Sequence, residues 1–205
     1  MGAKDWMIVY ADGDVRSVLL KAPEPDRDAT RALVARLYPD HEIAPLDDGN
    51  LYENANPRDG EVYAGVFDGL AIVCMGDVAL DAPSRVAPGF LAEGLGRTTY
   101  VHAMHRVVDW CAFAVWAPDG SPRRAVSLSP DSGIVENNGE PYAFEAPFWS
   151  GERPFGDGYS LPFHPLELAE DALRAFFGFN YEGVYLDDDP DLEDVVLLGF
   201  AVAER

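Results

Sequence analysis

The stretch GEVYAGVFDGLAIVCM, residues 60–75, carries two β-rich runs on either side of Asp68-Gly69. Valine, isoleucine, tyrosine and phenylalanine favour strands, and Asp-Gly is a dipeptide typical of tight hairpin turns. The stretch therefore predicts a β-hairpin. Because the two strands of a hairpin pair antiparallel, it also indicates the character of the sheet around it.

The chain before this hairpin reads as a strand followed by a helix. DWMIVYA, residues 5–11, is a short apolar run that ends at the turn sequence DGD, as a buried first strand does. A helix is predicted from Asp26, its N-cap, to residue 38, where Pro39 helps to stop it.

The chain after the hairpin is predicted to form a meander of strands and then a long helix. Residues 98–116 are rich in β-branched and aromatic residues, and turns at APDGS and SPDSG separate them from two further strands. An irregular aromatic loop at 140–165 leads to the clearest helix, from Pro165 to Gly178, and VVLLGFAVA forms a last strand that we expect to be central. The pattern predicts an α+β fold: a mixed, mainly antiparallel sheet with helices packed on it, in one globular domain over residues 1–205.

The charge of the 205-residue chain limits its partners. Fifteen basic and 36 acidic residues give a formal charge of −21, which repels phosphate backbones and anionic membrane surfaces. We therefore expect no direct nucleic-acid binding and no membrane association. Cys74 and Cys111 lie in apolar runs without metal-ligand spacing, and no secretory signal or membrane-spanning run is present, so a cytoplasmic protein with reduced core thiols is expected.

The stretch YVHAMHRVVDW, residues 100–110, holds two of the four histidines. In a helix, His102, His105 and Asp109 would share a face and form a catalytic group or a metal site of undetermined metal. In a strand the two histidines point to opposite faces, unless a bulge near Met104 turns both imidazoles to one side. The β-branched and aromatic flanks favour the strand. A structural, a catalytic and a metal-binding role all remain open at this point.

Other candidate residues lie in two turns and in the aromatic loop. His164 directly precedes the helix at 165–178, where its ring either serves a cleft as an acid, base or ligand contact, or caps local backbone groups. Asp12 ends the first predicted strand and either binds a cation or a substrate hydroxyl, or simply forms the turn. Phe148 and Trp149 belong to an aromatic set that either lines a ligand pocket or closes the open side of the sheet.

Several motifs argue against common activities. DDDPDLED, residues 187–194, has acids at calcium-loop spacing, but Leu192 replaces the required glycine and Leu198 the bidentate glutamate. We predict a solvated acidic turn there. The signatures of the common serine hydrolases, zinc proteases and β-lactamases are absent from the sequence.

Five strings spread over the chain carry a family resemblance: WMIVYADGDV, DGEVYAG, YVHAMHRVVDWCAFAVW, SLSPDSGIVENNGEPYAFEAPFW and LPFHPLELAEDALRAFFGF. Together they resemble an uncharacterised family of actinobacterial proteins, a domain of unknown function found as a stand-alone chain. The resemblance covers nearly the whole chain and implies a bacterial, cytoplasmic, single-domain protein. It implies no activity, cofactor or site residue.

Two functional hypotheses follow. The first is a non-enzymatic, acidic binding or regulatory protein that holds a protein partner or a small ligand with the aromatic loop and the surface around its histidines. The second is a hydrolase-like or metal-dependent enzyme, with His102, His105, Asp109 and Asp12 gathered at one end of the sheet and carboxylates orienting imidazoles. The sequence leaves the cofactor and the oligomeric state undetermined.

Overall fold

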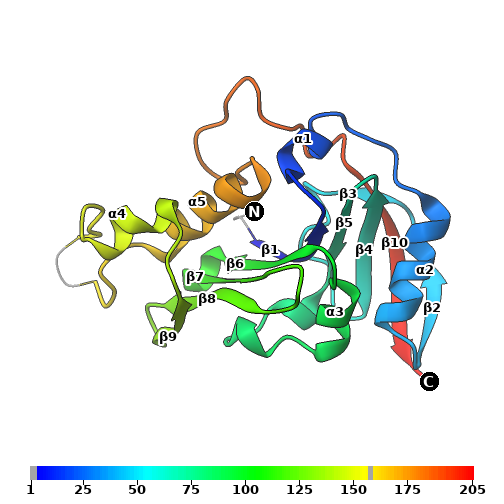
Figure 1. Ribbon diagram of the computed structural model, residues 1–205, viewed down its shortest axis with the longest axis horizontal. Helices are drawn as coiled ribbons and strands as arrows, with labels where there is room; N and C mark the ends of the chain where they lie inside the picture. The colour runs from blue at the N-terminus through cyan, green and yellow to red at the C-terminus, as the bar shows by residue number, and fades with distance from the viewer. Residues whose placement is uncertain (1–3, 157–158) are drawn as a thin grey trace.

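The computed structural model describes residues 4–156 and 159–205. In these residues ten strands form one sheet against which five α-helices pack (Figure 1). The strand order is β2-β10-β4-β5-β1-β6-β7-β8-β9, with β3 also paired to β10, and every pairing is antiparallel. The predicted α+β class is confirmed, and the sheet expected to be mixed is antiparallel throughout the described residues.

The strands are β1 (Lys4–Ala11), β2 (His41–Pro45), β3 (Gly49–Asn50), β4 (Glu61–Phe67), β5 (Leu70–Cys74), β6 (Thr98–His105), β7 (Trp110–Trp116), β8 (Pro122–Ser129), β9 (Gly133–Gly139) and β10 (Val196–Glu204). The α-helices are α1 (Val15–Leu19), α2 (Arg27–Leu37), α3 (Pro88–Glu93), α4 (Ala146–Trp149) and α5 (Pro165–Phe177). Single 3₁₀ turns are η1 (Gly76–Val78), η2 (Pro83–Arg85), η3 (Arg106–Val108) and η4 (Ala143–Glu145).

The hairpin and the two long helices form where their local signals predict them. In the β4–β5 hairpin Phe67 pairs with Leu70, and Gly69 adopts a φ of +74°, which a side chain would disfavour. The Asp26 side chain accepts hydrogen bonds from two amides of the first turn of α2. Helix α5 begins at Pro165 and ends at Phe177, and Gly178 caps it with a φ of +82°.

Helices cover both faces of the sheet, so the protein has two hydrophobic cores. Along the central strand β1, Met7 and Val9 face the core shared with α1, α4 and α5. Ile8 and Tyr10 face the core shared with α2 and α3. A strand buried on both faces reads as an uninterrupted apolar run, which explains why DWMIVYA shows no alternation.

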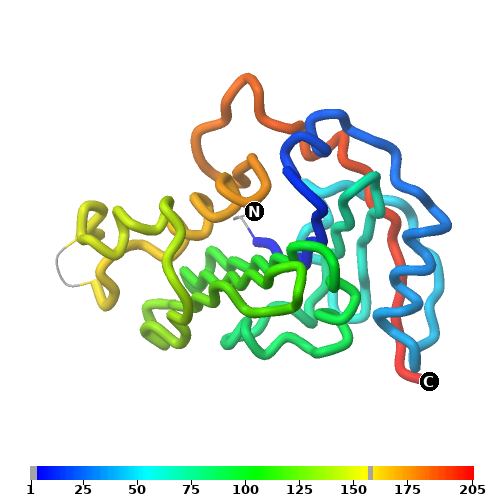
Figure 2. Tube along the Cα trace, in the orientation of Figure 1, coloured from blue at the N-terminus to red at the C-terminus, as the bar shows by residue number. Residues whose placement is uncertain are grey.

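The C-terminal part of the chain returns across the first core. Figure 2 shows the segment after α5, in orange, passing beside α1 before the chain ends in the red strand β10. Arg16 of α1 forms an ion pair with Asp188 of that segment, 2.6 Å between Nη2 and Oδ2. Strand β10 contributes Leu197 to one core and Phe200 to the other, yet it lies next to the edge strand β2, so its predicted central position is wrong.

The aromatic loop is more regular than its composition predicts, because a buried ion pair organises it. η4 and α4 form within it, and residues 157–158 of the loop lie outside the described part of the chain. The Glu145 carboxylate accepts hydrogen bonds from the Arg124 guanidinium, the Tyr142 amide and the Trp149 indole. The proline-rich composition of the loop does not reveal the ion pair between Arg124 and Glu145, which joins β8 to the start of α4.

Candidate functional site

The two histidines of YVHAMHRVVDW lie on opposite faces of the sheet. The stretch forms β6, the turn η3 and the start of β7, which confirms the predicted strand. His102 pairs in register with Phe113 and faces the core beneath α5, whereas His105 faces Trp6, with 5.8 Å between ring centroids. β6 pairs with β7 without a register shift, so no bulge turns the two imidazoles to one side. They do not share a site.

His102 has a structural position. Its Nδ1 lies 2.8 Å from Oδ2 of Asp5, and its Nε2 lies 3.1 Å from the carbonyl oxygen of Ala169 in α5. A carboxylate and a carbonyl both accept hydrogen bonds, so this arrangement favours the imidazolium form, in which both ring nitrogens donate. Burial alone lowers the pKa of His102, but the Asp5 carboxylate and the Ala169 carbonyl outweigh it, and the pKa is raised. The pair ties β1, β6 and α5 together.

This pair predicts a fall in stability above neutral pH. Because the folded pKa of His102 exceeds its unfolded value of about 6.5, its contribution is fully present below that pH and is lost as the pH rises through the folded pKa. Urea unfolding at pH values rising from about 6.5 towards the folded pKa should show a decline of up to about 1.4 kcal/mol per pH unit. His105→Gln should keep this slope. Stability that is flat or rising over this window would contradict a charged pair.

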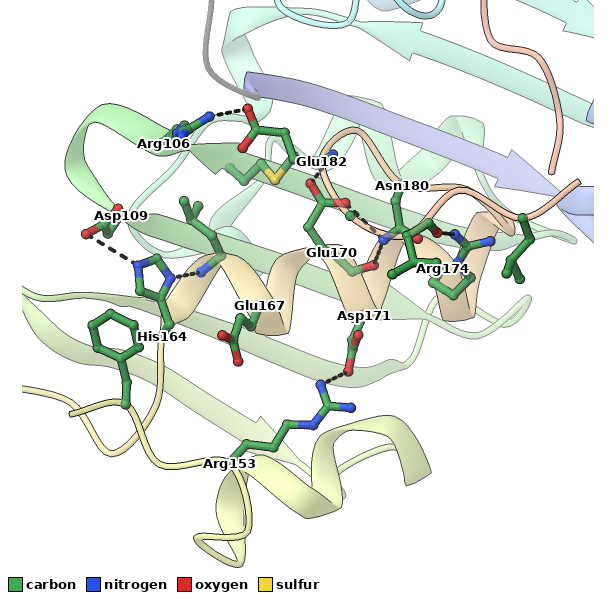
Figure 3. A pocket seen from close by; sticks show the side chains of 16 residues that line it. Arg106, Asp109, Arg153, His164, Glu167, Glu170, Asp171, Arg174, Asn180 and Glu182 are labelled. Atoms are coloured by element: carbon green, nitrogen blue, oxygen red, sulfur yellow. Dashed lines mark hydrogen bonds and ion pairs between the residues drawn. The ribbon is translucent and has the colours of Figure 1, made fainter.

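A cleft of about 900 Å³ opens beside α5; we call it the α5 cleft. Its walls come from the β6–β7 turn, the loop before α5, the exposed side of α5 and the segment after α5 (Figure 3). The lining residues are Met104, Arg106, Asp109, Arg153, Phe155, His164, Leu166, Glu167, Glu170, Asp171, Arg174, Asn180, Glu182, Gly183, Val184 and Leu186.

One wall is held in place by Glu170 of α5. Its carboxylate accepts hydrogen bonds from the Asn180 side chain and from the amides of Tyr181 and Glu182, at 2.8 to 3.0 Å. Burial raises the pKa of Glu170 although these donors lower it. This carboxylate is therefore occupied in ordering the backbone that faces α5.

The same wall is fastened by two arginines. Arg174 donates to the Val184 carbonyl at 2.9 Å and forms an ion pair with Asp189. Arg106 of η3 forms an ion pair with Glu182 across the cleft mouth (Figure 3). Asp189 is nearly buried, so the prediction that DDDPDLED is a solvated turn is wrong for this residue.

His164 and Asp109 meet at one end of the cleft (Figure 3). His164 is the N-cap of α5, and its Nδ1 accepts the Leu166 amide at 3.2 Å. The proton of the neutral ring therefore lies on Nε2, which is 3.7 Å from Oδ2 of Asp109. That separation is too long for a direct hydrogen bond, so the donor and the acceptor face each other with neither satisfied by the other.

Aromatic rings support His164 from the side. Phe155 and Tyr159 pack on the imidazole, with centroids 4.6 and 5.8 Å away. Burial raises the pKa of Tyr159, and the nearby Asp109 carboxylate raises it further. The backbone of Asp109 is in the left-handed region, with φ +46° and ψ +41°, a conformation that aspartate tolerates better than most residues.

Three other predicted site residues lie away from this cleft. Phe148 is fully buried against Phe163, and the Trp149 indole is bonded to Glu145, so both close the core and do not line the cleft. Asp12 lies in the turn directly after β1, whereas Asp5 lies near the start of that strand. The Asp12 amide donates a hydrogen bond to the Gly69 carbonyl. In residues 4–156 and 159–205, no three histidine, cysteine, aspartate or glutamate side chains are grouped to hold a metal ion.

Of the predicted site residues, the structure brings together only Asp109 and His164. Sequence reasoning placed them in separate candidate groups, because 54 residues of chain lie between them in an irregular order of strands and loops. It missed the charged side of α5, where Glu167, Glu170 and Arg174 recur at helical spacing. Such a charged stripe is also typical of a solvent-exposed helix face, so by itself it is weak evidence for a binding site.

Comparison with known proteins places the chain in a family. Residues 5–200 match the model of a family of unknown function (DUF6928), and the chain belongs to that family. The predicted resemblance to a domain of unknown function is thereby confirmed, while the actinobacterial origin stays a prediction. No curated protein and no solved structure matches the chain. No helix in the described residues is long and apolar enough to span a membrane.

Proposed function

We propose that this member of the DUF6928 family binds a small ligand in the α5 cleft. The observation that carries the proposal is the pair formed by the His164 Nε2–H and the Asp109 carboxylate, 3.7 Å apart at the end of the cleft. Neither group satisfies the other, so both are open to a ligand. A hydroxyl or an amide can bond to both, whereas an ammonium group, which has no acceptor, bonds to the carboxylate alone.

The size and lining of the cleft support a ligand of this kind. A volume of about 900 Å³ falls within the range of small-molecule sites, roughly 300–1,000 Å³. Part of the lining is apolar. The apolar side chains are those of Met104, Phe155, Leu166, Val184 and Leu186. Ligand sites combine apolar surface with polar groups that orient the ligand, and in this cleft the polar and charged residues are the majority of the lining.

The geometry favours binding over hydrolysis. The described lining holds no serine, threonine, cysteine or lysine that would serve as a nucleophile. His164 accepts the Leu166 amide on Nδ1, so its Nε2 is protonated in the neutral ring and cannot take a proton from a substrate. Both cysteines are fully buried, and burial raises the pKa of each thiol.

A substitution at the cleft mouth tests the proposal. Val184 lines the cleft and is 77% exposed, so Val184→Trp fills the mouth without disturbing the core. We expect a fragment screen by ligand-observed NMR to find small molecules that bind the wild type and whose affinity drops at least about tenfold in this variant.

Val107→Trp is the matched control. Val107 is also an exposed valine, 84% accessible, but it does not line the cleft. It should retain the affinity of the wild type for every fragment. The proposal is wrong if the screen yields no binder, or if the binders it yields are equally tight for wild type and Val184→Trp.

A further inference from the structure

We infer that the ligand of the α5 cleft is a cation, an ammonium group carried on an apolar body. This inference rests on the proposed function, because it assigns the chemical class of the ligand at the same site. It follows from which charged groups in the cleft are already paired, which are free, and what apolar surface lies beside them.

The arginines of the cleft are committed to other groups. Arg106 is paired with Glu182, Arg153 with Asp171 at 2.7 Å, and Arg174 with Asp189. Each guanidinium already has a carboxylate partner, so an anionic ligand that bound its remaining N–H groups would share its positive charge with that carboxylate. The cleft therefore offers an anion no free positive side chain among its described lining residues.

The start of α5 does not provide an anion site either. Pro165 has no N–H, the Leu166 amide is bonded to Nδ1 of His164, and the Glu167 amide is bonded to the His164 carbonyl. These first amides are the groups that bind anions at open helix starts. Here the chain itself satisfies them.

Carboxylates outnumber cations in the lining. Three arginines face five acidic side chains, which are Asp109, Glu167, Glu170, Asp171 and Glu182. Glu167 is exposed and forms no ion pair or side-chain hydrogen bond with the described residues, and the Asp109 carboxylate lies 3.7 Å from Nε2 of His164, beyond hydrogen-bond distance. An ammonium group would supply the missing positive charge at either carboxylate.

Apolar surface beside these carboxylates fits the body of an amine. Phe155 is 43% exposed and packs on His164 at one end of the cleft, and Leu166 lies one residue before Glu167. An aromatic face attracts an ammonium group and its adjacent methylenes, whereas it gives a carboxylate no such attraction. The net charge of −21 adds a long-range field that draws cations towards the protein.

Three probes of equal chain length test the charge of the ligand. Isothermal titration with hexylammonium, hexanol and hexanoate compares a cation, a neutral molecule and an anion on the same apolar body. We expect hexylammonium to bind at least about fivefold more tightly than hexanol at low salt, and hexanoate to bind most weakly. Raising the ionic strength should reduce the difference between the cation and hexanol.

Glu167→Gln removes the free carboxylate while keeping its shape. We expect hexylammonium to bind this variant about threefold to fivefold more weakly and hexanol to bind it unchanged. Glu140→Gln, at an exposed glutamate outside the cleft, should leave both affinities unchanged.

The outcomes separate this inference from the proposed function. The inference of a cationic ligand is wrong if hexanoate or hexanol binds as tightly as hexylammonium. It is also wrong if Glu167→Gln leaves the affinity for hexylammonium unchanged. The absence of hexylammonium binding at millimolar concentrations overturns it as well. The proposed function is decided independently by the fragment screen and its dependence on Val184→Trp.

Discussion

Arg124→Ala is expected to lower the free energy of unfolding by about 3–5 kcal/mol, because it leaves the Glu145 carboxylate charged and buried without its partner. Both side chains are fully buried, and the guanidinium meets the carboxylate through Nε at 3.0 Å and Nη2 at 2.6 Å. Arg124 also donates to the carbonyl oxygens of Asn138 and Gly139 on β9. Its loss therefore affects β8, β9 and α4 together.

Urea unfolding of Arg124→Ala and Arg123→Ala measures this effect. Arg123 is the exposed neighbour of Arg124, and its replacement should cost less than about 0.5 kcal/mol. The double variant Arg124→Met, Glu145→Leu should recover much of the loss, since it removes both charges at once. A loss below about 1 kcal/mol for Arg124→Ala would contradict the role given to this pair.

His102→Ala is expected to destabilise the protein by a similar amount, about 3–5 kcal/mol. The substitution leaves Asp5 buried and unpaired, and Oδ1 of Asp5 already has no hydrogen-bond partner among the described residues. It also removes the bond to the Ala169 carbonyl that fixes α5 on the sheet. The floor of the α5 cleft then loses its support, because Met104 of the same strand lines it.

His105→Ala is the matched control, a histidine three residues further along β6 on the opposite face. It should cost less than about 1 kcal/mol in the same urea titration. Equal losses for the two variants would contradict the assignment of His102 to a buried ion pair and of His105 to a peripheral ring contact.

The fold could be predicted where local chemistry decides it. The Asp68-Gly69 turn, the Asp26 cap and the Pro165 start each specify backbone geometry within a few residues, and each forms as predicted. The position of β10 in the sheet could not be predicted in this way. A strand covered on both faces is equally apolar at the centre and next to the edge, so its sequence does not reveal its neighbours.

The site could be predicted only in part, for a related reason. His164 was a candidate because it stands before a clear helix start, and Asp109 because it follows two histidines. Their contact depends on how the β6–β7 turn lies against α5, and no local pattern encodes that distance. His102 and His105 looked like a pair in sequence, but the alternation of a regular strand separates them.

The most direct test of the central claim is a crystal structure of the protein grown with saturating hexylammonium. We expect electron density in the α5 cleft, with the ammonium nitrogen about 3 Å from a carboxylate oxygen of Glu167 or Asp109. The alkyl chain should lie against Phe155 and Leu166. An empty cleft in crystals whose ligand occupies a different surface, such as the acidic pocket beside Tyr38 and Asp77, would contradict the claim.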